Sequence, residues 1–147
     1  MNINSFLGSK KLSNFFWKTY REDPQNIETE SHRLLHRSGF ISQVSSGIFS
    51  FLPIGWRSIE KIKNIIRDEM NNSGALEINM PVVQPSDLWT KSGRIDTFIP
   101  PLAKFSDRRD NELIIAPTHE ETVTDMVAKN VSSYRDLPFI LYQIQTK

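Results

Sequence analysis

The chain has 147 residues, of which 38% are hydrophobic and 24% charged, with a formal net charge of +1 and no cysteine. This length and composition suit one soluble domain with its own core, and the lack of cysteine excludes disulfides and thiol chemistry and fits an expected cytoplasmic location. The near-neutral charge excludes recruitment of nucleic acid by a global field. No apolar run approaches the roughly 20 residues that span a bilayer, so no membrane role is expected.

The first half of the chain predicts two helices and a strand. After the turn marked by Asp23-Pro24, apolar residues at helical spacing predict a helix that stops at Gly39. A strand is expected over 48–52. The clearest amphipathic pattern predicts a helix over 54–72. Its apolar stripe consists of Trp56, Ile59, Ile62, Ile66 and Met70.

The second half mixes short strands with loops and one further helix. Alternating apolar residues predict strands, and Pro81 ends the first of them because proline lacks a backbone donor. In chain order we expect a strand over 76–80, a loop-rich stretch over 84–101, a hairpin of 102–105 with 113–116, a helix over 119–130 and a strand over 139–146. The fold class is therefore α+β.

The segment Pro117-Thr118-His119-Glu120-Glu121 lies where a predicted strand meets a predicted helix. Thr118 followed three residues later by Glu121 is typical of a capping box, in which the hydroxyl accepts a hydrogen bond from the Glu121 amide. The functional interpretation is that Thr118 and Glu120 face a pocket, where the carboxylate binds a cationic group by a charge-assisted hydrogen bond. Both interpretations can hold, because the cap does not need Glu120.

Other polar patterns are weaker. His32 and His36 are spaced to share a metal, but no third ligand is evident, so packing histidines are favoured. Ser92-Gly93-Arg94 predicts a flexible turn that is either solvated or meets an anion. The chain has no Gly-rich phosphate loop of the Walker or Rossmann type and no predicted metal site. Spacing and composition alone thus predict a soluble domain with a candidate pocket for an ammonium group.

Four stretches in order carry a resemblance to a known family: 45–55, 80–89, 116–121 and 142–147. Together they resemble bacterial-type prolyl-tRNA synthetases, which are class II aminoacyl-tRNA synthetases. The resemblance spans residues 12–147, and residues 1–11 look like an N-terminal extension. It implies that 12–147 is the N-terminal part of a class II catalytic domain, an incomplete antiparallel sheet with flanking helices.

The resemblance also implies roles for individual residues. Residues 54–83 match the first signature of the family, which builds a homodimer interface, and Pro81 matches its proline. Thr118 and Glu120, in the loop 117–121, match the Thr-x-Glu pattern that binds the imino group of proline. Arg94 falls in a loop that borders the active site of the family.

The implied activity is that of a proline–tRNA ligase. Such an enzyme activates L-proline with ATP and Mg²⁺ and transfers the prolyl group to tRNA(Pro). The arginine signatures that stabilise the transferring phosphoryl group are expected beyond Lys147, so catalytic residues stay unknown and the 147 residues are expected to be a fragment without activity alone. The alternative is a non-catalytic module, derived from a synthetase, that dimerises or binds proline or a partner.

Overall fold

The structure is a computed structural model that describes residues 15–22 and 29–147. The N-terminal extension predicted over 1–11 and the turn at Asp23-Pro24 lie outside these residues. The chain divides into two compact units, residues 1–66 and 67–147. The division into an extension and one catalytic part over 12–147 stays a prediction.

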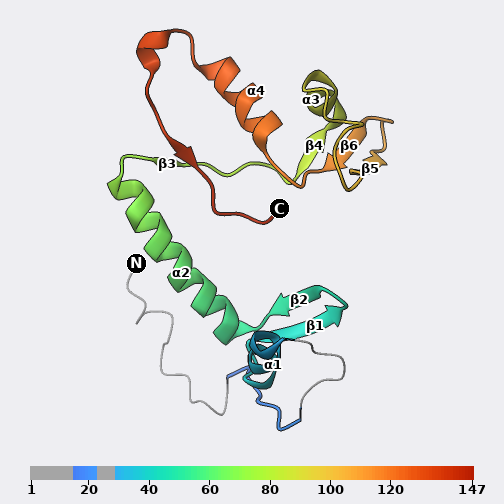
Figure 1. The fold of residues 1–147 in the computed structure, drawn as a ribbon, viewed down its shortest axis with the longest axis vertical. Helices are drawn as coiled ribbons and strands as arrows, with labels where there is room; N and C mark the ends of the chain where they lie inside the picture. Colours follow the sequence, from blue (N-terminus) through green and yellow to red (C-terminus); the bar gives the residue numbers. More distant parts are fainter. Residues whose placement is uncertain (1–14, 23–28) are drawn as a thin grey trace. The chain divides into compact units, whose positions relative to one another are not determined.

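The first unit contains a helix followed by a hairpin (Figure 1). Helix α1 (Glu30–Arg37) ends where predicted, because Gly39 adopts a left-handed φ of 69°. A Cβ atom on Gly39 would lie 2.2 Å from the carbonyl oxygen of Lys18, so no larger residue fits there.

The hairpin joins β1 (Ile41–Ser45) to β2 (Ile48–Phe51) in antiparallel pairing. The strand predicted over 48–52 is thus confirmed. Its partner β1 was not predicted, because Ser42, Gln43 and Ser45 give it little apolar alternation.

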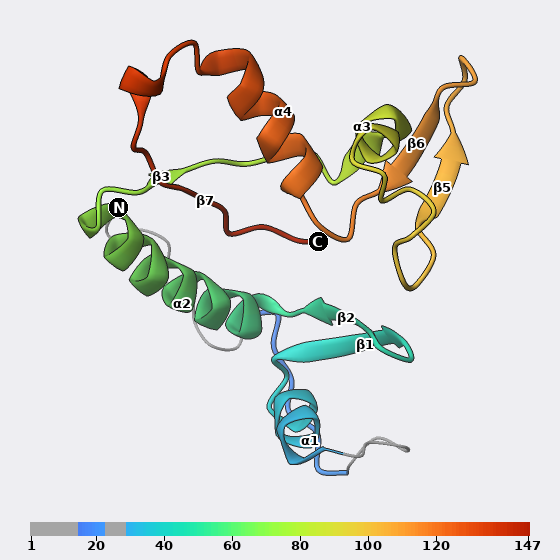
Figure 2. The same ribbon diagram turned by 45° about the horizontal axis from the view of Figure 1, so that its top comes forward.

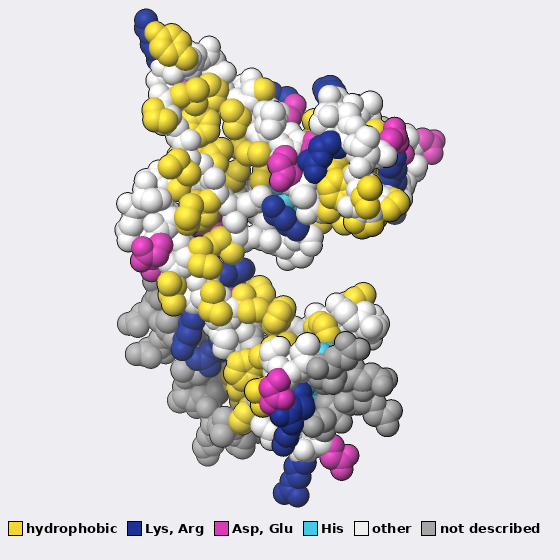
Figure 3. All heavy atoms as spheres, in the orientation of Figure 1, with side chains coloured by type: hydrophobic (Ala, Val, Ile, Leu, Met, Phe, Trp, Pro, Cys, Tyr) yellow, Lys and Arg dark blue, Asp and Glu magenta, His cyan; other side chains and the backbone are white. Residues whose placement is uncertain are grey.

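Helix α2 (Pro53–Asn72) confirms the strongest prediction of the sequence. It ends before Gly74, whose φ of 82° is left-handed. Figure 3 shows apolar side chains at the surface in yellow. Large exposed ones on α2 are Trp56, Ile62, Ile65 and Ile66. Part of the predicted apolar stripe is therefore not covered by the described residues of this chain.

The second unit is organised around a three-stranded antiparallel sheet in the order β4-β6-β5. Strands β5 (Ala103–Ser106) and β6 (Glu112–Ile115) are the predicted hairpin, and β4 (Val83–Pro85) pairs with the other side of β6. Helix α3 (Ser86–Lys91) packs against β4 and β6 (Figure 2). The loop expected over 84–101 therefore contains a helix, which is too short to show a helical apolar period.

The core of this unit lies between α3 and the sheet. Trp89, Ile114 and Ala116 are fully buried, and four partly buried apolar residues pack on them: Leu88, Ile95, Phe98 and Leu102. The indole N–H of Trp89 donates to Oε1 of Gln84 at 3.0 Å, so the buried ring has its polar partner. Helix α4 (Glu120–Asn130) follows β6, as predicted within one residue.

Two short strands, β3 (Leu76–Glu77) and β7 (Leu141–Tyr142), pair in parallel. The strands predicted over 76–80 and 139–146 are therefore too long. The ladder is short because the backbone of Met80 bonds to the side chain of Gln145 instead of to another strand. A 3-10 turn, η3 (Tyr134–Asp136), precedes β7.

The arrangement of helices with small, mainly antiparallel sheets confirms the α+β class. Among the described residues no helix is both long and apolar enough to cross a membrane.

Candidate functional site

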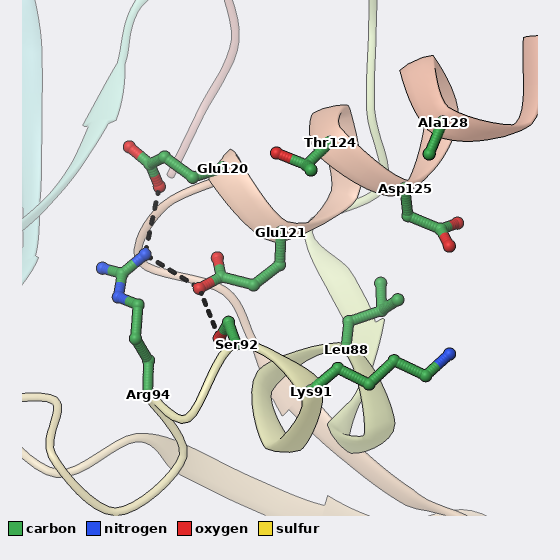
Figure 4. A pocket seen from close by; sticks show the side chains of 9 residues that line it. All are labelled: Leu88, Lys91, Ser92, Arg94, Glu120, Glu121, Thr124, Asp125 and Ala128. Carbon is green, nitrogen blue, oxygen red and sulfur yellow. Dashed lines mark hydrogen bonds and ion pairs between the residues drawn. The ribbon is translucent and has the colours of Figure 1, made fainter. Parts of the chain in front are cut away.

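An open cavity of about 380 Å³ lies between α3 and α4. Its walls come from α3, from the turn that follows α3, and from the first two turns of α4 and the residue after them (Figure 4). Arg94 and Glu120 both line it, so the structure brings together two of the residues that the sequence singled out. Thr118 is not among the lining residues.

Arg94 reaches from the turn toward two carboxylates on α4 (Figure 4). Its Nη1 donates to Oε1 of Glu121 at 2.8 Å and lies 3.6 Å from Oε2 of Glu120. The guanidinium carbon is 5.2 Å from the ring centres of both Trp89 and Phe98. Arg94 is therefore held by an ion pair and two aromatic contacts. Ser92 and Gly93 of the turn are exposed, so the turn is solvated while its cation meets carboxylates of the same chain.

The two neighbouring carboxylates differ in their surroundings. The side chain of Glu121 is 2% exposed, and its Oε1 also accepts a hydrogen bond from the Ser92 hydroxyl at 3.1 Å. The side chain of Glu120 is 64% exposed, and its contact with Arg94 is longer than a hydrogen bond. Glu121 therefore anchors Arg94, while the oxygens of Glu120 are open at the mouth of the cavity.

The Glu120 carboxyl is biased toward its charged form. Its pKa is lowered from 4.5, first by the Thr118 hydroxyl, then by its own backbone N–H, and further by the charges of Arg94 and Lys147, while partial burial opposes the shift. A carboxylate held ionised at a cavity mouth can accept hydrogen bonds from an ammonium group.

Thr118 does not act as the predicted helix cap. The residue that precedes α4 is His119, no side chain caps the helix, and the buried Oγ1 of Thr118 lies outside hydrogen-bond geometry to any described group. The capping box is therefore wrong, because α4 begins one residue later than the pattern requires. The hydroxyl of Thr118 is the largest cause of the lowered pKa of Glu120, although the two groups do not form a hydrogen bond of normal geometry.

The backbone of this loop is held by buried side chains that the sequence did not single out. Gln84 donates from Nε2 to the carbonyl oxygen of Thr118 at 3.4 Å. His119 places Nε2 3.2 Å from the carbonyl oxygen of Pro81. Pro81 is thus near this loop through its backbone. No periodicity announces such residues, because polar side chains in a core are defined by partners distant in sequence.

The two histidines with metal-like spacing pack against aromatic rings. His32 meets Phe49 edge-on at 4.7 Å, and His36 lies 5.0 Å from the ring of Tyr20. The packing interpretation is confirmed. The described part of the chain contains no group of three or more His, Cys, Asp or Glu side chains that could hold a metal ion.

Known proteins resemble this chain closely. No protein-family model matches it. It is 53% identical over 137 residues to the proline–tRNA ligase of Dehalococcoides mccartyi and 50% identical to that of Burkholderia vietnamiensis, each match covering 93% of this chain and 24% of the relative. The chain therefore spans about a quarter of the length of these curated relatives.

Solved structures give the same class. The RNA binding domain of threonyl-tRNA synthetase from Cryptosporidium parvum Iowa II matches 69% of this chain and 25% of its own, with a TM-score of 0.62 and 29% identity. Prolyl-tRNA synthetase from Cryptosporidium parvum, complexed with L-proline and AMP, matches 76% of this chain and 22% of its own, with a TM-score of 0.60; at 19% identity it supports the fold alone.

By sequence and by fold the chain is thus related to aminoacyl-tRNA synthetases. Within that class the resemblance predicted from its motifs is confirmed: the chain is similar over 93% of its length to a segment of proline–tRNA ligases, also named prolyl-tRNA synthetases. These relatives do not favour the alternative of a non-catalytic module.

Proposed function

We propose that this chain is part of a proline–tRNA ligase and that its loop 117–121 receives the imino group of L-proline. The observation that carries the proposal is the ionised, outward-facing carboxylate of Glu120 at the mouth of the cavity. The secondary ammonium of proline has two N–H donors, and the Glu120 carboxylate supplies the open acceptor. The Thr118 hydroxyl is buried in this structure, so the proposal requires the loop to expose it as the second acceptor. The long contact with Arg94 leaves the Glu120 oxygens free to accept.

Arg94 has a supporting role in this proposal. The Thr118 hydroxyl is the largest cause of the lowered pKa of Glu120, and the charge of Arg94 adds to it from 3.6 Å without forming a hydrogen bond to the carboxylate. The ammonium group of the substrate then binds the Glu120 carboxylate on the side that is open to the cavity mouth.

The reaction proposed for the whole enzyme has two steps. The proline carboxylate attacks the α-phosphorus of ATP, which forms prolyl-adenylate and releases pyrophosphate. A terminal ribose hydroxyl of tRNA(Pro) then takes the prolyl group and releases AMP. ATP is proposed to be used together with Mg²⁺ in the first step.

The same proposal includes assembly and location. The exposed apolar residues of α2 and the segment that ends at Pro81 fit the homodimer interface expected over 54–83. Exposed apolar residues of this kind are unfavourable in water, and the same face of a second copy of the chain would bury them. The enzyme is proposed to work in the cytoplasm.

The test is proline-dependent exchange of pyrophosphate into ATP, measured on the protein expressed from the complete reading frame. Glu120→Ala is expected to raise the KM for proline about tenfold to a hundredfold, because a charge-assisted hydrogen bond is lost, and to leave the KM for ATP within about twofold. Glu112→Ala removes an exposed acid of β6 and is the control. An unchanged KM and turnover for proline in Glu120→Ala would contradict the assignment.

A further inference from the structure

His119 separates the two residues proposed to receive the imino group, yet it cannot itself face the ligand. It is 1% exposed, and it lies at the start of α4 between Thr118 and Glu120. A buried imidazole ring lowers the stability of the fold unless its nitrogen atoms form hydrogen bonds. The contacts of His119 show that one of its ring nitrogens has partners.

Gln145, near β7, is the first partner of His119. Its Oε1 accepts from the backbone N–H of Met80 at 2.8 Å, and its Nε2 donates to the carbonyl oxygen of Met80 at 2.8 Å. This paired contact settles which end of the amide is nitrogen. Nε2 therefore has a second hydrogen to offer, and His119 Nε2 lies 3.1 Å away.

The carbonyl oxygen of Pro81 is the second partner, 3.2 Å from the same ring nitrogen of His119. Nε2 can serve one of these partners at a time. With its hydrogen on Nε2 the ring donates to Pro81; with the hydrogen on Nδ1 it accepts from Gln145. Nδ1 is buried and has no partner, so both tautomers bind the ring through Nε2 alone.

A second, independent contact holds the residue before His119. Gln84 is fully buried, donates to the carbonyl oxygen of Thr118 at 3.4 Å, and accepts from the core residue Trp89 at 3.0 Å. The backbone of the loop is thus fixed at 118 by the core and at 119 by the segment 80–81.

We propose that His119 and Gln145 are positioning residues for the candidate site: together with the backbone of Met80 and Pro81 they form a partly buried latch that sets where Thr118 and Glu120 lie. The inference rests on the proposed function of those two residues. Neither His119 nor Gln145 lines the cavity, so they act through the loop and not on the substrate. A displacement of about 1 Å at such a site can cost a hundredfold in rate.

Two substitutions of His119 separate positioning from simple filling of space. The Nε2 of a glutamine side chain reaches the place of the ring Nε2, whereas the amide of asparagine reaches only the place of Nδ1, which has no partner. His119→Gln should therefore keep the KM for proline within about twofold, and His119→Asn should raise it about tenfold or more, with the KM for ATP changed less than about twofold in both. Pyrophosphate exchange by the protein from the complete reading frame gives these values.

A second readout follows the latch without catalysis. The amide hydrogen of Met80 is bonded to Gln145, and that of Val123 to the carbonyl oxygen of His119. In His119→Asn both amides should exchange with solvent at least about tenfold faster than in the unaltered protein, and in His119→Gln they should not. Tyr142→Phe is the matched control, because it removes a hydrogen bond of β7 to Asn71 and leaves the latch intact.

The two His119 variants distinguish the outcomes. The proposal is supported if His119→Asn raises the KM for proline and speeds hydrogen exchange of the two amides, while His119→Gln does neither. Equal effects in the two variants, or an unchanged KM for proline in His119→Asn, overturn it while the ligase assignment stands. If the unaltered protein shows no proline-dependent exchange of pyrophosphate into ATP, both the proposed function and this inference are overturned. If His119→Asn does not fold, Gln145→Glu carries the test, since it retains the acceptor for Met80 and loses both donors: a raised KM supports the latch, and an unchanged KM overturns it.

Discussion

The two units of the chain differ in their cores: the second has a buried apolar cluster, whereas most large apolar residues of the hairpin in the first are exposed. In the second unit Trp89 and Ile114 are fully buried between α3 and the sheet, whereas in the first unit Val44 is 68% and Ile48 59% exposed on the hairpin β1-β2. The candidate site lies on the unit with the closed core. There the ring of Trp89 contacts the guanidinium of Arg94, and its indole N–H donates to the amide oxygen of Gln84. One core residue thus contacts both a cavity-lining residue and a residue that holds the loop.

The largest expected effect comes from breaking this core. Trp89→Ala should lower the free energy of unfolding by about 3 to 5 kcal/mol, because it opens a cavity and leaves the buried amide of Gln84 without its donor. Trp56→Ala, on the exposed stripe of α2, should lower it by about 1 kcal/mol or less. Denaturant unfolding followed by far-ultraviolet circular dichroism measures both.

The same pair of variants sharpens the contrast between the units. Amide exchange on β6 should accelerate in Trp89→Ala, since the ring packs on Ile114, and should be unchanged in Trp56→Ala. Equal losses in the two variants would show that the core of the second unit is not what stabilises the chain.

An intermediate effect is expected within the site, from the neighbouring carboxylates. Glu121→Gln should cost about 1 to 3 kcal/mol, because it removes the charge of a buried side chain that holds Arg94 and Ser92. Glu120→Gln should cost less than about 1 kcal/mol, because its contact with Arg94 is long and largely solvated. Thermal unfolding of the two variants, side by side, gives the difference. A larger loss in Glu120→Gln would mean that the anchoring roles are reversed.

Regular patterns in the sequence predicted the regular elements. The apolar period of 54–72 became α2, and the alternating runs on either side of 106–111 became β5 and β6. The short elements were missed: β1 has few apolar residues, and α3 has six residues after a proline, too few for a period to appear. Strand pairing beyond 77 failed because Gln145, 65 residues away from Met80, replaced a strand partner with its side chain.

The site was predicted in part for the same reason. Thr118, Glu120 and Arg94 could be singled out because they belong to local motifs, and the structure brings Arg94 and Glu120 to one cavity. Glu121, one residue further on, was assigned to a cap, yet it is the buried anchor of Arg94. Because α4 begins at Glu120, one residue later than the cap pattern requires, Glu121 turns inward, while Glu120 lines the cavity as predicted.

The smallest expected effect concerns the charge of Glu120. Thr118→Val keeps the shape of the side chain and removes the hydroxyl that is the largest cause of the lowered pKa, so the pKa of Glu120 should rise toward its ordinary value of 4.5. A lowered pKa adds stability that is present above the unfolded-state value and is lost as the pH falls through the folded-state value. The variant should therefore be less stable than the unaltered protein above about pH 4.5, and the stabilities of the two should converge in more acidic solution. Thr122→Val makes the same change at a buried hydroxyl within α4 and should leave the pKa of Glu120 where it was. Carbon-13 nuclear magnetic resonance measures the pKa of the Glu120 carboxyl in both variants. An identical pKa in Thr118→Val and in the unaltered protein would show that the Thr118 hydroxyl does not act on Glu120.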